Sequence, residues 1–90
     1  MSAPGYRIGD VARLLGLSTH AIRAWERRYG TVAPARDEKG KRVYSQAEVD
    51  RLLLVKRLAD FGHPLTDMAS RPTSELEALL RRTRSLADQR

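Results

Sequence analysis

The connection between two helical patterns at Gly16 is very short, and this constrains the fold more than any other feature of the sequence. Residues 10–15 carry apolar side chains at the spacing of one helix face. Gly16 is the permissive residue that commonly follows a helix C-terminus, and Ser18 or Thr19 can cap a second helix directly afterwards. That second helix is expected to stop at Gly30. We therefore predict two helices that meet at a tight turn.

The second helix is predicted to have one packing side and one free side. The small residue Ala12, midway along the first helix, allows the second helix to cross close to it. Apolar residues mark the packing side at Ile22, Trp25 and Tyr29, and the free side carries His20, Arg23, Ala24 and Arg27. A free helix side raised in this way is suited to enter a DNA major groove. Tight helix pairs also occur as plain structure, and the pattern alone leaves that alternative open.

Residues 33–44 break the helical pattern and are typical of two short strands around a glycine-containing turn. The expected β-hairpin is basic, through Arg36, Lys39, Lys41 and Arg42. Such clustered charge is best explained by contact with phosphates or by insertion into a narrow minor groove. Residues 6–8 are predicted to add a short edge strand.

The second half of the chain is predicted to hold a long core helix and two further helices. Residues 45–48 match a capping box that opens the core helix, and its wide apolar arc extends to Phe61. A short helix is expected over 64–69, Pro72 breaks the chain, and a last helix begins near Ser74. The apolar stripe of that last helix consists of Leu76, Leu79, Leu80 and Thr83.

These elements predict a mainly α fold of the winged helix-turn-helix type, in which the hairpin is the wing. The length of 90 residues suits one hydrophobic core. We expect residues 1–72 to form the winged domain. Residues 73–90 are expected to form a C-terminal helix that either packs on this domain or begins a linker to an effector domain.

The charge of the chain favours a polyanionic partner. The formal net charge is +6, and it is unevenly distributed, with nine Lys or Arg against four Asp or Glu up to Tyr44 and eight against seven afterwards. The positive surface is therefore expected in the first half, on the helix pair and the hairpin. An arginine-rich surface that only serves solubility is the plainer alternative.

Several functional classes are disfavoured by the composition. The absence of cysteine excludes a disulfide, a thiolate metal site and a thiol nucleophile. No apolar run approaches the length of a membrane span, and the first nine residues show no secretory signal, so we expect a soluble cytoplasmic protein associated with the nucleoid. His20 and His63 have no metal-ligand partner at suitable spacing, and the short helices offer no pocket for a hydrolytic triad. We predict no enzyme, no metal and no cofactor in this chain.

The wording of the chain resembles a known family. The sequence reads IGDVARLLGLS at 8–18, IRAWERRYG at 22–30, and PAR at 34–36 followed by GKRVYS at 40–45. Over residues 6–69 this resembles the MerR family of bacterial transcription regulators. The wording RAWERRYG is most similar to the subgroup of light-responsive, cobalamin-binding repressors of carotenoid synthesis, whereas many other members carry a Tyr-Tyr pair at Ala24 and Trp25.

The resemblance implies sequence-specific binding of double-stranded DNA for transcription regulation, with repression as the outcome. The second helix would occupy the major groove, and the wing would touch the flanking backbone or the minor groove. The candidate DNA-binding residues are Thr19, His20, Arg23, Ala24, Trp25, Arg27, Arg36, Lys39, Lys41, Arg42 and Tyr44.

Three side chains in this region have a second interpretation. Trp25 fits a core or hinge position better than base stacking, although its indole N–H can still reach a phosphate. Tyr44 is expected to pack at the base of the hairpin with its hydroxyl available to the DNA backbone. Glu26 is expected to pair with a nearby arginine and hold it in position, or else to be an ordinary solvated charge.

Family members usually continue into a long dimerisation helix and an effector domain. We therefore expect this chain to be the amino-terminal part of a longer protein, with a short self-sufficient regulator as the alternative. Cobalamin could bind only in such a further domain, since the chain has no Asp-x-His-x-x-Gly motif. We expect a monomer for this chain and a dimer or higher oligomer for a longer parent. Two other functions stay open, namely docking of an acidic antirepressor that imitates DNA and a protein adaptor that uses the leucine stripe.

Overall fold

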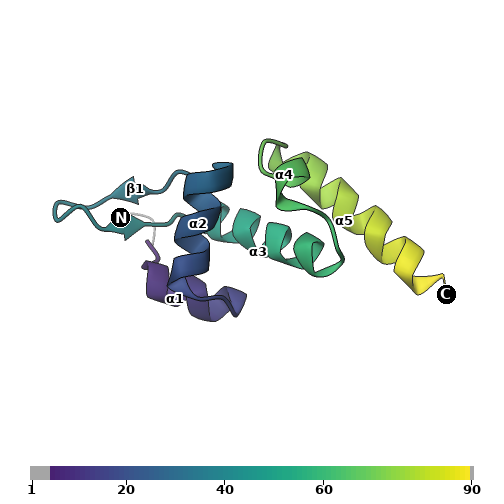
Figure 1. Ribbon diagram of the computed structural model, residues 1–90, viewed down its shortest axis with the longest axis horizontal. Coiled ribbons are helices and arrows are strands. Elements are labelled where there is room, and N and C mark those ends of the chain that lie inside the picture. Colours follow the sequence, from purple (N-terminus) through teal and green to yellow (C-terminus); the bar gives the residue numbers. More distant parts are fainter. Residues whose placement is uncertain (1–4, 90) are drawn as a thin grey trace.

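The computed structural model describes residues 5–89, which form five helices and one small sheet (Figure 1). In chain order the elements are α1 (Ile8–Leu15), α2 (Thr19–Tyr29), β1 (Ala35–Arg36), β2 (Arg42–Val43), α3 (Gln46–Asp60), α4 (Leu65–Met68) and α5 (Thr73–Asp88). The hairpin projects at one end of the molecule, and α5 lies at the other (Figure 1). Among these described helices, none is both long enough and apolar enough to cross a membrane.

The turn between α1 and α2 forms as the sequence predicts. Gly16 adopts a left-handed conformation with φ of 68°, which a residue with a Cβ reaches only with strain. The backbone N–H of Leu17 then donates to the carbonyl oxygen of Ala12 over 3.0 Å. Of the two predicted caps, Ser18 is the one used, because its hydroxyl oxygen accepts from the N–H of Ala21 at 3.1 Å. Helix α2 begins one residue later with its direction fixed by this turn.

The prediction of an edge strand over 6–8 is wrong in its extent. Tyr6 alone pairs with Tyr44 in an isolated antiparallel bridge, with N–H to oxygen distances of 2.8 and 2.9 Å. Ile8 is already the first residue of α1, since the carboxylate of Asp10 accepts from the backbone N–H of Arg7 at 3.4 Å and the carbonyl oxygen of Arg7 accepts from the N–H of Asp10 at 3.0 Å. Local helix capping therefore prevails over the apolar pattern at this point.

The hairpin is a two-stranded antiparallel sheet in which Ala35 pairs with Val43 and Arg36 with Arg42. Gly40 in the turn has a φ of 79°, the left-handed conformation for which glycine is suited. The predicted basic hairpin is thus present, although its paired part is only two residues long on each side.

A first core cluster lies under the helix pair and the base of the hairpin. Its fully buried side chains include Val11 of α1, Ile22 of α2 and Leu52 of α3, together with Tyr44 directly after β2. The predicted capping box of Ser45 and Glu48 starts α3. Helix α3 thus supports both α2 and the base of the hairpin.

A second core cluster joins α3 to the two last helices. It consists of the buried residues Val55, Leu58, Met68, Leu76 and Leu80. Trp25 packs against both clusters, which supports its predicted core or hinge position. Helix α5 therefore packs on α3 in this chain, and the division into a domain at 1–72 and a separate helix at 73–90 remains a prediction.

The prediction that Phe61 belongs to the apolar arc of the core helix is wrong. Helix α3 ends at Asp60, Phe61 stands at its C-cap position, and 49% of the surface of Phe61 is exposed. Because the chain turns away at Gly62, with a φ of 102°, the packed arc ends at Ala59, two residues before Phe61.

Candidate nucleic-acid interface

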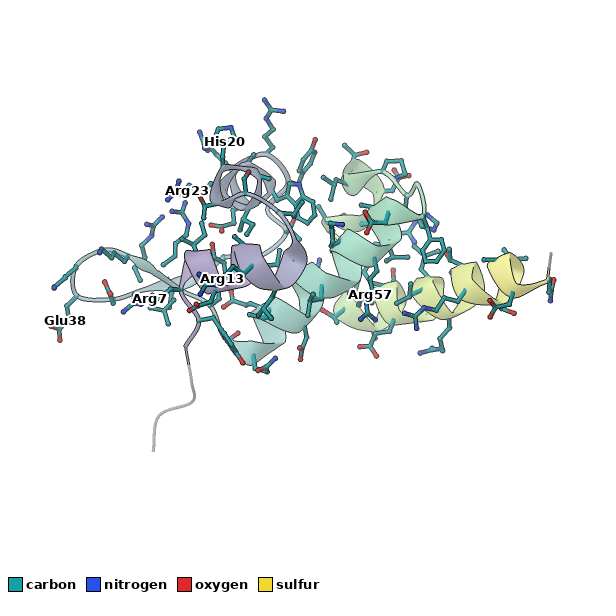
Figure 2. The ribbon with its side chains drawn as sticks, turned by 90° about the horizontal axis from the view of Figure 1, so that it is seen from below. Arg7, Arg13, His20, Arg23, Glu38 and Arg57 are labelled. Atoms are coloured by element: carbon teal, nitrogen blue, oxygen red, sulfur yellow. The ribbon has the colours of Figure 1, made fainter. Side chains whose placement is uncertain are left out.

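The outer side of α2 carries a row of exposed basic side chains. His20, Arg23, Arg27 and Arg28 are all exposed, whereas Ile22 on the opposite side is fully buried. Figure 2 shows His20 and Arg23 on the outer side of this helix, away from the core. The exposed side of α2 that the helical periodicity predicts is therefore confirmed.

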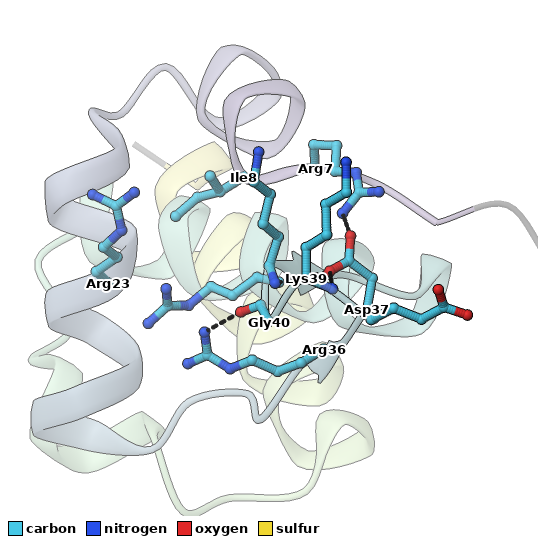
Figure 3. A pocket seen from close by; sticks show the side chains of 10 residues that line it. Arg7, Ile8, Arg23, Arg36, Asp37, Lys39 and Gly40 are labelled. Carbon is cyan, nitrogen blue, oxygen red and sulfur yellow. Dashed lines mark hydrogen bonds and ion pairs between the residues drawn. The ribbon is translucent and has the colours of Figure 1, made fainter.

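A hollow of about 1060 Å³ separates α2 from the wing. Its lining consists of Arg7, Ile8, Arg23, Arg36, Asp37, Glu38, Lys39, Gly40, Lys41 and Arg42, so six cationic side chains face two acidic ones. Arg23 of α2 lines one side of this hollow, and the side chains of the hairpin line the other (Figure 3). The structure thus brings the predicted helix and wing cations together on one surface.

Cations of this hollow are left without partners in the folded chain. Among the described residues, the side chains of Arg23, Lys39 and Lys41 make no hydrogen bond or ion pair. Like charges this close together repel, so their clustering costs stability unless an anion is bound between them. The hollow is suited to a polyanion.

Asp37 holds the turn of the wing. Its carboxylate accepts from the backbone N–H groups of Lys39 and Lys41, both at 2.9 Å, and from the guanidinium of Arg7 at 2.8 Å. These bonds, above all the one from the Lys41 amide and then the one from Arg7, hold the pKa of Asp37 below its ordinary value. Across the turn, Arg36 donates to the carbonyl oxygen of Gly40 at 3.0 Å (Figure 3). The wing cations therefore stand on an ordered turn.

Glu26 pairs with an arginine, as the sequence predicts, and this arginine comes from the wing. One carboxylate oxygen of Glu26 accepts from Nε of Arg42 at 2.8 Å. The other accepts from the hydroxyl of Tyr44. The hydrogen bond from Arg42 to Glu26 raises the pKa of the Arg42 guanidinium.

The prediction that the Tyr44 hydroxyl is available to the DNA backbone is wrong. Tyr44 is fully buried, and its hydroxyl donates to Glu26. Burial first, and then the hydrogen bond to Glu26, raises the pKa of Tyr44 well above its ordinary value. The sequence shows an amphipathic residue at the base of the hairpin but not the carboxylate from α2 that occupies its hydroxyl.

The other candidate residues differ in their exposure. Lys39, Lys41 and Arg36 are exposed on the wing, while Arg42 is half-buried by its pairing with Glu26. Among the candidate residues on α2, Thr19, Ala24 and Trp25 are partly buried. Two further exposed cations, Arg7 and Arg28, were not predicted as site residues; the position of Arg28 next to Arg27 is the signal that could have indicated it.

Comparisons with known proteins identify the type of domain. Residues 6–70 match the model of the MerR HTH family of regulatory proteins. The chain belongs to the MerR HTH family. The predicted resemblance is thereby confirmed, over nearly the same residues.

Relatives within the MerR HTH family are transcriptional regulators. The HTH-type transcriptional repressor CarH of Myxococcus xanthus is 39% identical over 79 residues, which cover 88% of this chain and 26% of CarH. The HTH-type transcriptional regulator MlrA of Escherichia coli is 42% identical over 57 residues, which cover 63% of this chain and 24% of MlrA. The chain thus spans about a quarter of the length of these relatives. Their nature agrees with the prediction that this chain is not an enzyme.

Solved structures of the MerR HTH family share the fold. HiNmlR, a MerR family regulator lacking the sensor domain and bound to promoter DNA, superposes with a TM-score of 0.64 at 21% identity, covering 94% of this chain and 69% of HiNmlR. A MerR family regulator from Bacillus cereus gives a TM-score of 0.67 at 17% identity, with the same two shares. The predicted winged helix-turn-helix fold, mainly α with a small hairpin, is confirmed.

Proposed function

We propose that this chain binds double-stranded DNA to regulate transcription, with α2 in the major groove and the hairpin wing on the flanking backbone or minor groove. The observation that carries the proposal is the hollow in which Arg23 of α2 faces Lys39 and Lys41 of the wing without partners. A major groove admits one α-helix, and the phosphates at its edge supply the anions that such cations need.

The two sides of the hollow have different roles in this proposal. Arg23 and Arg27 lie one helical turn apart on the exposed side of α2, where they reach base edges. Thr19 and His20 stand in the first turn of the helix and read bases at shorter range. Arg36, Lys39 and Lys41 on the wing neutralise phosphates, which adds affinity but little sequence information.

Arg42 contributes less to DNA contact than a fully exposed arginine would. Its Nε is engaged by Glu26, and only 22% of its side-chain surface is exposed. The remaining guanidinium N–H groups are the part of Arg42 that can meet a phosphate.

Repression is the regulatory outcome that we propose. CarH and CarA of Myxococcus xanthus, which are 39% and 47% identical to this chain in the matched regions, are both named transcriptional repressors. A DNA-binding domain that covers a promoter excludes polymerase without any further chemistry, so the fold needs no cofactor for this effect. In a longer parent protein we propose that two copies bind together on a two-fold operator.

A gel-shift titration across a salt series tests the proposed function. The probe is the duplex upstream of the gene that encodes this chain, and the competitor is a scrambled duplex of the same length and composition. Because Lys and Arg contacts release counterions, the affinity is expected to fall steeply as the salt concentration rises, and the upstream duplex should be preferred. No shift at low salt, or a shift without preference and without salt dependence, would exclude the proposal and favour a protein adaptor.

A further inference from the structure

Glu26 is an acidic residue on the helix proposed to read DNA. Its side chain is only 10% exposed, and it is directed to the wing rather than to the free side of α2. Both of its oxygens are engaged, one by Nε of Arg42 at 2.8 Å and the other by the hydroxyl of Tyr44. We call these three residues the Glu26 clamp.

The Glu26 clamp is the hydrogen-bonded link between α2 and the wing. Among the described residues, no backbone hydrogen bond joins α2 to the segment from β1 to Tyr44. The side-chain hydrogen bonds that join these two parts are those that Glu26 accepts from Arg42 and Tyr44. Beside the packing of Tyr44 in the first core cluster and the ion pair of Arg7 with Asp37, the wing is therefore held against α2 by one carboxylate.

A carboxylate at this place opposes DNA binding on charge alone. It lies on the same helix as Arg23 and Arg27, and its negative charge weakens the field that attracts phosphates. A nearly buried carboxylate also costs free energy of desolvation unless both oxygens are well paired, as they are here. The negative charge of Glu26 is unfavourable for DNA binding, so its presence is better explained by its contribution to the geometry of α2 and the wing.

We propose that Glu26 is a positioning residue that fixes the wing against α2, so that helix and wing engage one stretch of DNA together. This inference rests on the proposed function and adds to it how the two DNA contacts are coupled. With the wing held in place, binding of α2 presents Lys39 and Lys41 to the flanking phosphates without a further ordering cost. Without the clamp, the orientation of the wing relative to α2 must be fixed at the moment of binding.

The substitution Glu26→Gln separates geometry from charge. Glutamine keeps the shape but removes the negative charge, and its N–H₂ group replaces one of the two acceptors. Charge alone predicts tighter DNA binding by this variant, whereas loss of the clamp predicts binding about 10-fold weaker. The matched control is Glu38→Gln, which removes an equal charge from the exposed turn of the wing and leaves the clamp intact (Figure 2).

A double-mutant cycle with Lys41→Ala measures the coupling. Fluorescence anisotropy gives the Kd of the upstream duplex for the wild type, Glu26→Gln, Lys41→Ala and the double variant. In the wild type, Lys41→Ala is expected to weaken binding several-fold, and in the Glu26→Gln background its effect should shrink toward none. A purely structural role of Glu26 would lower the thermal midpoint but leave the effect of Lys41→Ala unchanged.

Each outcome of this experiment decides between the hypotheses. Glu26→Gln that melts cooperatively and binds as tightly as Glu38→Gln would overturn the inference alone. If Glu26→Gln does not fold, Tyr44→Phe replaces it, because it keeps the buried ring and removes one donor to Glu26; unchanged coupling in that variant would overturn the inference. A wild type that does not bind the duplex would overturn the proposed function, and the inference with it.

Discussion

Nε of Arg51 in α3 donates to the carbonyl oxygen of Thr31 at 2.8 Å, which ties the core helix to the loop between α2 and the wing. The same guanidinium donates to the carbonyl oxygen of Ala69 at 2.9 Å and to the hydroxyl of Thr73 at 3.1 Å. No carboxylate pairs with it among the described residues, and burial lowers its pKa. One side chain thus connects the loop between α2 and the wing with the end of α4 and the start of α5.

Replacing Arg51 by Met should destabilise the fold by roughly 1–3 kcal/mol, because carbonyl oxygens of Thr31 and Ala69 lose their donor inside the structure. Arg51→Lys should also be destabilising, since one ammonium cannot reach three segments in the way the planar guanidinium does. Urea denaturation followed by circular dichroism measures both losses. Arg57→Met on the same helix is the control, because Arg57 is exposed, and equal midpoints for the Arg51 and Arg57 variants would contradict the role of Arg51.

Truncating the core beneath α2 should remove much of the stability of so small a domain. Ile22 and Leu52 are both fully buried, so alanine at either position should cost about 2–5 kcal/mol. DNA binding would then be lost through unfolding rather than through a missing contact. Leu14→Ala serves as the comparison, because 54% of Leu14 is exposed, and thermal melts in which Ile22→Ala matches Leu14→Ala would argue against this packing.

The turn of the wing should loosen in acid. The amide of Lys41, the guanidinium of Arg7 and the amide of Lys39 favour the charged form of Asp37, so its pKa in the folded chain lies below the value of 3.8 expected when unfolded. The unfolded state therefore takes up this proton more readily. The contribution of Asp37 is fully present above about pH 3.8 and is lost as the pH falls through the folded pKa.

An NMR titration of the Lys39 and Lys41 amides follows this loss directly, and the two signals should shift together below the ordinary Asp range. Asp37→Asn should abolish the shared titration. Amides that titrate at or above the ordinary pKa of an Asp would show that the hydrogen bonds to Asp37 are not formed in solution.

Features set by local chemistry could be predicted from the sequence. Gly16 and Gly30 take the left-handed conformation at helix C-termini, Ser18 caps α2, and Ser45 with Glu48 opens α3, because each depends on residues within four positions. The exposed side of α2 followed from the helical period alone. The basic wing could also be predicted, because its glycine turn and its lysines and arginines lie close together in the sequence.

Features that depend on contacts between distant segments could not be predicted from the sequence. Tyr44 and Glu26 are 18 positions apart, so nothing in the local pattern shows that the hydroxyl of Tyr44 is occupied. Arg51 looks like an ordinary charge on a helix, yet its partners lie 18 to 22 positions away. The exposure of Phe61 depends on where α3 stops, and helix ends are the least certain part of a periodic pattern.

The 90-residue chain should be a monomer without DNA. Leu76 and Leu80 of α5 are buried against α3 and Leu79 packs against the same cluster, while Leu86 near the end of α5 is 68% exposed. The exposed charges of Arg81, Arg82 and Arg84 oppose close pairing of two such helices. Light scattering at tens of micromolar protein should give the monomer mass, and a stable dimer would show that α5 has a second packing surface.

Whether α2 reads the major groove is decided by four Kd values at one salt concentration. They are those of the upstream duplex and of its scrambled counterpart, each measured for the wild type and for Arg23→Ala. If α2 reads the major groove through Arg23, the wild type prefers the upstream duplex, and Arg23→Ala weakens that binding by about 1–3 kcal/mol while its affinity for the scrambled duplex changes much less. Equal Kd values for the two duplexes in the wild type, or an equal loss on both duplexes in Arg23→Ala, would contradict the assignment of α2 as the reading helix.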